Sequence, residues 1–104
     1  MTVNDLIKNL NADVHVLADG QREICGGYAG DFLSYVMSRA PSDSAWFTIM
    51  TNVNVAAVAT LTDVAVVVLC EGSTPDEVLI DKAKQNGINV ISTEKDIFTA
   101  VKAF

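Results

Sequence analysis

The chain has 104 residues, of which 50% are hydrophobic and 19% are charged, so it suits one domain with a packed core rather than a disordered segment. Its formal net charge of −6 argues against nucleic acid as a partner, because phosphate contacts need clustered lysine and arginine. The most apolar run, VAVVVLC at 64–70, is too short to span a bilayer, and no pattern typical of a signal peptide is present. We therefore expect a cytoplasmic protein with no membrane partner.

The N-terminal part of the chain predicts a helix followed by two short strands. Residues 3–10 carry apolar side chains at helical spacing, and Thr2 heads a capping-box pattern. Residues 13–18 alternate between polar and apolar types and predict a strand. The turn pair Asp19-Gly20 then predicts that residues 21–25 return as a second, antiparallel strand.

The middle of the chain predicts two helices and two buried strands. Residues 31–40 form an amphipathic helix that Pro41 stops. Residues 45–50 and 66–70 are strand-like, and the second of these runs lacks alternation, as expected when both faces are covered. Residues 53–61 are ambiguous between helix and strand, and we interpret them as a short buried helix. The inward face of the helix at 31–40 is expected to comprise Phe32, Leu33, Val36, Met37 and Ala40.

The C-terminal part predicts a helix, a strand and a final helix. Thr74 and Glu77 form a second capping-box pattern, and Asn86-Gly87 is a natural helix end. Residues 88–92 predict a strand, and Thr93 is expected to cap the last helix. The inner face of that helix is expected to comprise Ile97, Phe98, Val101 and Phe104.

Alternation of strands and helices predicts the fold class. Strand, short link, helix and strand in succession imply right-handed crossovers and parallel strands. We expect residues 1–104 to form a single-domain, three-layer α/β fold. Its sheet is predicted to be five-stranded and mostly parallel, with helices on both faces.

Polar and glycine-rich links are predicted to meet at the carboxyl edge of this sheet. Helix N-termini there could hold an anion through free N–H groups. Helix capping and chain turning explain the same residues without any ligand, and the two interpretations stay open. The tentative ligand-binding residues are Gly26, Gly27, Tyr28, Gly30, Asp31, Thr51, Asn52, Ser92 and Thr93.

The stretch GGYAG at 26–30 matches neither common phosphate-binding fingerprint. No lysine follows it as in a Walker loop, and its spacing is not G-x-G-x-x-G. We expect Gly26 and Gly27 to supply a positive φ for a sharp strand-to-helix turn, with any anion binding second. Asp31 is expected to cap the following helix or to lie in its first turn.

No residue pattern predicts catalysis, a metal site or a cofactor. His15 is the single histidine and lies in a predicted strand, without a second ligand at metal-binding spacing. Cys25 and Cys70 form no C-x-x-C pair and are expected to be free thiols. A Cys–His pair is possible in space, but no motif supports it. Asp31 and Asp63 could act as general acid or base, although capping and turn formation explain them equally well.

The apolar stretch from Trp46 to Leu69 raises the question of oligomerisation. Trp46 and Phe47 point to opposite faces of one strand, and one of them is expected to meet either a covering helix or a partner subunit. The whole stretch is too apolar for much of it to face water. It therefore predicts a symmetric dimer.

The residues from Gly26 to Thr93 resemble the DRTGG domain, a family named for a five-residue signature. Gly26 and Gly27 match the end of the signature, but Glu23, Ile24 and Cys25 stand at its Asp-Arg-Thr positions. If the family's Asp, Arg or Thr contributes to a ligand site or an interface, that role is changed or lost in this chain. The further matching positions are Gly30, Asp31, Leu33, Ser34, Thr48, Asn54, Ala56, Ala59, Ala83, Gly87, Ile88, Ser92 and Thr93.

The resemblance implies a regulatory module without catalytic activity and names no substrate. Family members stand alone, accompany CBS pairs in pyrophosphatases or precede phosphotransacetylases, where they are associated with dimerisation. We therefore expect a homodimer that acts on a partner enzyme. The alternative is a sensor that binds a small anionic metabolite or nucleotide at the glycine-rich edge.

Overall fold

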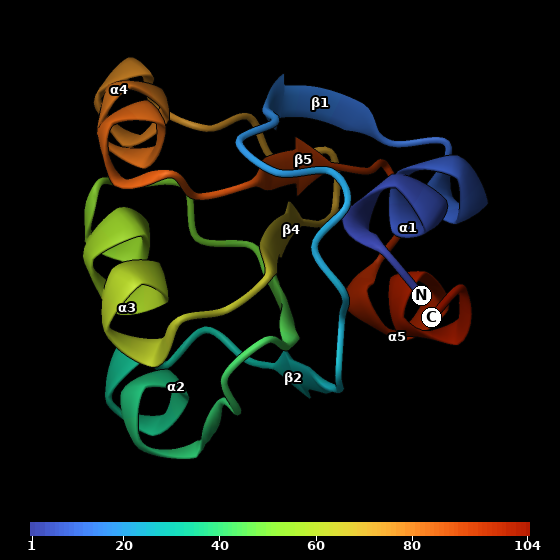
Figure 1. The fold of residues 1–104 in the computed structure, drawn as a ribbon, viewed down its shortest axis with the longest axis horizontal. Helices are drawn as coiled ribbons and strands as arrows, with labels where there is room; N and C mark the ends of the chain where they lie inside the picture. The colour runs from blue at the N-terminus through green and yellow to red at the C-terminus, as the bar shows by residue number, and fades with distance from the viewer.

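A five-stranded sheet forms the centre of the protein, in the strand order β1-β5-β4-β3-β2 (Figure 1). The computed structural model describes all residues from 1 to 104. Strands β2 to β5 run parallel, and β1 pairs antiparallel with β5. The predicted mostly parallel, five-stranded sheet is confirmed. Its strands are β1 (Asp13–Val16), β2 (Gly27–Ala29), β3 (Ala45–Thr48), β4 (Val66–Leu69) and β5 (Val90–Ser92).

Helices cover the two faces of the sheet (Figure 1). Helices α2, α3 and α4 lie on one face, and α1 and α5 lie on the other. Two separate apolar clusters, one on each face, correspond to this arrangement. The ambiguous stretch at 53–61 is a helix, as predicted. The helices are α1 (Val3–Leu10), α2 (Leu33–Arg39), α3 (Asn54–Thr62), α4 (Glu77–Asn86) and α5 (Ile97–Lys102).

Trp46 and Phe47 lie in different clusters, and both are covered within the chain. Trp46 packs against the side of α2, α3 and α4, while Phe47 packs against the side of α1 and α5. All residues of β3 and β4 are buried. The apolar character of the stretch from Trp46 to Leu69 is therefore explained by the fold of one chain. Contrary to the prediction, this stretch gives no argument for a dimer.

The expected hairpin around Asp19-Gly20 is wrong. Residues 21–25 form no strand, and Glu23 makes only an isolated bridge to Thr2. Strand β1 pairs with β5 instead, and the second strand is the glycine stretch itself. Residues 17–26, the light blue segment in Figure 1, cross from one edge of the sheet to the other, so that β2 lies at the edge opposite β1.

Helix ends follow local capping rules at α1 and α4, with one difference. Thr2 and Asp5 form the predicted capping box, and Gly87 ends α4 in the left-handed conformation at φ 68°. Helix α4 begins at Glu77, and the N-cap residue is the extended Asp76 rather than Thr74, so the predicted capping box does not form. The backbone N–H of Asp76 donates to the carbonyl oxygen of Thr51 at 3.0 Å, which ties the link before α4 to the neighbouring loop.

The last helix also begins later than predicted. Asp96, not Thr93, caps α5, and its carboxylate accepts from the N–H of Thr99 at 2.7 Å. These hydrogen bonds hold the pKa of Asp96 below its ordinary value.

The predicted inner face of α5 is also largely wrong, since Phe98, Val101 and Phe104 are exposed and Ala100 is the buried residue of α5. The predicted inward face at 31–40 is wrong for Phe32 and Met37, which are exposed as well.

Asn89 fastens the beginning of the crossing segment to the sheet. Its side-chain oxygen accepts from the N–H groups of Ala18 and Asp19 at 2.8 and 2.9 Å. Its amide nitrogen donates to the carbonyl oxygens of Asp19 and Ala65, each at 2.9 Å. The side chain is thus fully hydrogen-bonded although the residue is only 2% exposed.

We predict that Asn89→Ala lowers the free energy of unfolding by about 2–4 kcal/mol, because it leaves buried backbone groups without partners. Asn86→Ala is the matched control, since Asn86 is exposed and makes one side-chain hydrogen bond, to Thr60. It should cost less than about 1 kcal/mol. Urea denaturation followed by circular dichroism measures both values, and equal losses would contradict the role given to Asn89.

Candidate functional site

The carboxyl edge of the parallel strands gathers some, but not all, of the predicted ligand-binding residues. Gly30 and Asp31 follow β2, Thr51 and Asn52 follow β3, and Thr93 follows β5, while Ser92 ends β5. Gly26 and Gly27 lie at the opposite end, because residues 27–29 are strand β2 rather than a strand-to-helix turn. Tyr28 is in the middle of that strand. The nine predicted residues are therefore divided between the amino and carboxyl ends of the parallel strands, with Tyr28 between them.

Polar groups at the carboxyl edge make hydrogen bonds within the fold. Ser92 Oγ contacts His15 Nε2 at 2.8 Å, which gives the single histidine a structural partner. Asn52 Oδ1 accepts from the N–H of Asn54 at 2.9 Å, and Thr93 Oγ1 accepts from the N–H of Lys95 at 3.2 Å. These contacts shape turns, and this favours the structural interpretation of the links over the anion site.

Asp31 does not cap the following helix as expected. Its Oδ1 accepts from Thr48 Oγ1 at 2.7 Å and from the N–H of Ile49 at 2.9 Å. Helix α2 instead starts after Phe32 without a side-chain cap. Asp31 thus joins the end of β2 to the end of β3, beside a second link in which Trp46 Nε1 donates to the carbonyl oxygen of Gly30 at 2.9 Å.

The electrostatic environment of this edge is acidic. Burial, together with the nearby carboxylates of Glu71, Asp31 and Asp96, raises the pKa of the Cys70 thiol to about 11. Three negative charges that act on one thiol at the end of β4 disfavour a bound anion. No three His, Cys, Asp or Glu side chains lie close enough together to hold a metal ion.

The requirement for glycine lies at Gly26 rather than at Gly27. Gly26 has a φ of 138°, a conformation that L side chains rarely adopt. Gly27 has ordinary strand geometry, and an added Cβ would make only normal contacts, 3.5 Å from the Ala45 carbonyl oxygen. The positive φ therefore allows the chain to enter β2, not to leave it.

Arg22 is a structural residue that no sequence motif marks. Its guanidinium donates to Asp43 Oδ1 at 2.8 Å and to Asp63 Oδ1 at 3.0 Å, and also to the Asp63 carbonyl oxygen. Asp63 is therefore an ion-pair partner of Arg22 rather than a free acid or base. The spacing along the chain gives no signal for this contact, because it joins three loops that are distant in sequence.

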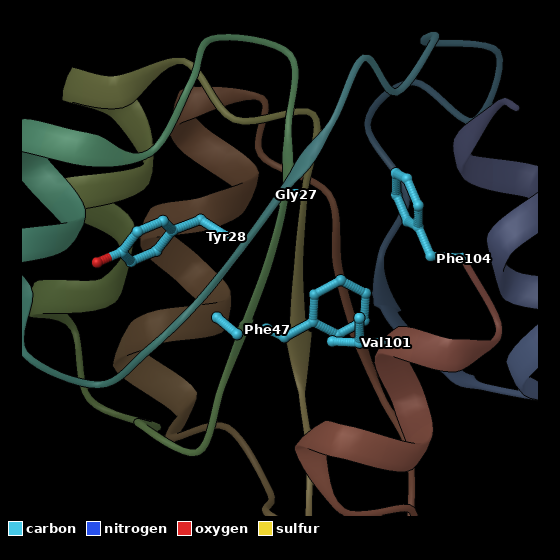
Figure 2. Close-up of a pocket in the computed structure, with 6 residues that line it drawn as sticks. Gly27, Tyr28, Phe47, Val101 and Phe104 are labelled. Carbon is cyan, nitrogen blue, oxygen red and sulfur yellow. The ribbon is translucent and has the colours of Figure 1, made fainter.

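An apolar hollow of about 310 Å³ lies beside strand β2. Figure 2 shows Phe47, Val101 and Phe104 on one side of the strand, while the ring of Tyr28 points away to the other side. The hollow exists because Gly27 and Ala29 contribute almost no side chain to this face. Strand β2 is also the last strand of the sheet, so its outer edge has no partner.

Comparison with known proteins gives the family. The family model of the DRTGG domain matches residues 44–104, more than half of the chain. The chain belongs to the DRTGG domain family. The match begins after the segment in which we placed the signature, so Glu23 to Gly27 lie outside it. A search of the curated proteins found no match.

A solved structure shares the fold of this DRTGG chain. It is the regulatory region of a Clostridium perfringens pyrophosphatase, containing CBS and DRTGG domains in complex with the activator diadenosine tetraphosphate. The TM-score is 0.79 at 18% sequence identity, and the alignment covers 98% of this chain. It covers 45% of that chain, so the likeness concerns less than half of the larger regulatory region. None of the helices of the present chain is long and apolar enough to cross a membrane.

We predict that Gly26→Ala lowers the free energy of unfolding by about 1–3 kcal/mol through backbone strain. Gly27→Ala is the matched control, and it should change stability by less than about 1 kcal/mol, because its backbone and surroundings accept a methyl group. Chemical denaturation of the two variants measures the difference. A larger loss for Gly27→Ala would show that the strained position has been assigned to the wrong glycine.

We predict a pH dependence that originates at Cys70. The folded thiol keeps its proton up to about pH 11, whereas an unperturbed thiol releases it near 9.0. The stability contributed by the neutral thiol is thus present below pH 9.0 and is lost as the pH rises toward 11. The unfolding free energy of the wild type minus that of Cys70→Ala should fall over this interval. A constant difference would contradict the prediction.

Proposed function

We propose that this DRTGG chain is a non-catalytic regulatory module that pairs with a second copy of itself and passes a signal to a partner enzyme. The observation that carries the proposal is a set of exposed apolar side chains in or next to helices α2 and α5, of which Val101 and Phe104 line the hollow at open strand β2. Exposed apolar groups that lie close together mark interaction surfaces, because association removes them from water. They are Phe32, Tyr35 and Met37 on the α2 side, and Phe98, Val101 and Phe104 on the α5 side.

The comparison supports the regulatory part of the proposal. The structural neighbour is described as a regulatory region of an enzyme, and it carries its DRTGG domain together with CBS domains. We extend this role to the present chain, whose partner would then be an enzyme that it contacts through exposed surface.

A sensor for a small anionic metabolite or nucleotide is the second interpretation. The activator bound by the neighbour favours it, since diadenosine tetraphosphate is a nucleotide. The carboxyl edge disfavours it, because Asp31, Glu71 and Asp96 make the surroundings of Cys70 acidic. The association proposal is therefore preferred over binding of an anion at this edge.

We predict that the wild-type chain sediments as a dimer, with twice the chain mass of 11.1 kDa. Apolar side chains provide most of the contact, so the dimer should persist at high ionic strength, where surface charge pairs are screened. Sedimentation equilibrium over a micromolar concentration series measures the mass. A mass of 11.1 kDa at every concentration would remove homodimerisation from the proposal.

A further inference from the structure

We infer that the second copy docks edge to edge on strand β2, with the two β2 strands antiparallel around a twofold axis at Tyr28. The two sheets then join into one continuous sheet. This inference rests on the proposed function, because it names the surface through which the pairing occurs.

The main chain of β2 is complementary to itself in this arrangement. The carbonyl oxygen of Gly26 and the N–H of Gly30 bond to β3. Because bonding direction alternates along a strand, the N–H and C=O groups of Gly27 and Ala29 point away from β3. An antiparallel copy centred on Tyr28 places Gly27 opposite Ala29, and each then bonds the outward groups of the other.

The two edges of the sheet differ in how they resist such pairing. Edge strand β1 contains Asp13 and His15, and its register with β5 shifts between Val14 and Val16. Charged side chains and register irregularities on an edge strand hinder its pairing with a strand of another chain. Strand β2 has neither, and its side chains are those of Gly27, Tyr28 and Ala29. The unprotected edge is therefore β2.

The hollow fits a second copy because the twofold axis is perpendicular to the joined sheet. The α5 helices of both copies, and the two hollows beside them, then lie on the same face. Helix α5 packs over β3. Two α5 helices would therefore lie about three strand spacings apart, roughly 14 Å. That gap exceeds the usual 8–10 Å between packed helices. Large side chains have to fill it, and Phe98, Val101 and Phe104 are available and exposed.

Charge complementarity also favours a second copy over a different partner. Asp31 precedes α2 and Arg39 lies in its last turn, while Asp96 precedes α5 and Lys102 lies in its last turn. Both helices start at the carboxyl edge, so both carry the acid at one end of the surface and the base at the other. The antiparallel twofold arrangement brings the acidic end of each helix toward the basic end of its mate.

The first test is the variant Ala29→Lys in the full chain, measured by sedimentation equilibrium. Ala29 is exposed, so the variant should keep the far-ultraviolet circular dichroism spectrum of the wild type. We expect the dimer dissociation constant to rise by roughly 10-fold or more, because a charge enters the apolar hollow of each copy. Leu61→Lys is the matched control, since Leu61 is 72% exposed on α3 and should leave the constant unchanged.

The second test is Tyr28→Cys in a Cys25→Ala background. Cα atoms of directly opposed residues in a non-hydrogen-bonded antiparallel pair are about 4.5 Å apart, which permits a disulfide. We expect mild oxidation to give a covalent dimer, seen on a non-reducing gel. If the wild type is a dimer, Ala29→Lys has an unchanged dissociation constant and Tyr28→Cys forms no disulfide, this inference is overturned. The proposed function then still stands. A monomeric wild type overturns both.

Discussion

The crossing of the chain along the amino edge of the sheet is the constraint on which the rest of the structure depends. Strand β1 lies at one edge and β2 at the other, so residues 17–26 must pass three intervening strands. Asn89 holds the start of this segment through backbone hydrogen bonds, and Arg22 holds its middle to Asp43 and Asp63. The N–H of Cys25 bonds the carbonyl oxygen of Asp43, and Gly26 then turns the chain into β2.

The crossing also determines what β2 offers to its surroundings. A strand placed last has one neighbour, so half of its main-chain groups face outward. Small side chains at Gly27 and Ala29 leave the adjacent face uncovered, and α5 is too far over β3 to fill it. Helices α2 and α5 lie on the two faces of the sheet (Figure 1), and Val101 and Phe104 lie on the α5 side of β2 (Figure 2). The open edge and the apolar surface thus have one structural origin.

Local patterns in the sequence predicted the parts of the fold that depend on local physics. The capping box at Thr2, the helix end at Gly87 and the buried strands β3 and β4 follow from spacing and residue type. The pairing of β1 with β5 and the contacts of Arg22 depend on loops that meet only in the folded chain, and no short-range pattern encodes them. The glycine stretch forms strand β2 rather than the predicted strand-to-helix turn, for a related reason. Glycine is rare within strands, and the missing side chains at β2 leave a hollow that a single chain does not fill.

The location of the hollow changes where function is expected in this fold. Parallel α/β sheets usually bind ligands at the carboxyl edge, where helix N-termini meet. Here the polar groups of that edge, including Asp31 and Thr48, bond one another, and the carboxylates near Cys70 make it acidic. The neutral, apolar surface with unused hydrogen-bonding groups lies instead along the side of β2. A surface of that kind matches another main chain better than it matches a phosphate, and this is the physical reason to prefer association over anion binding.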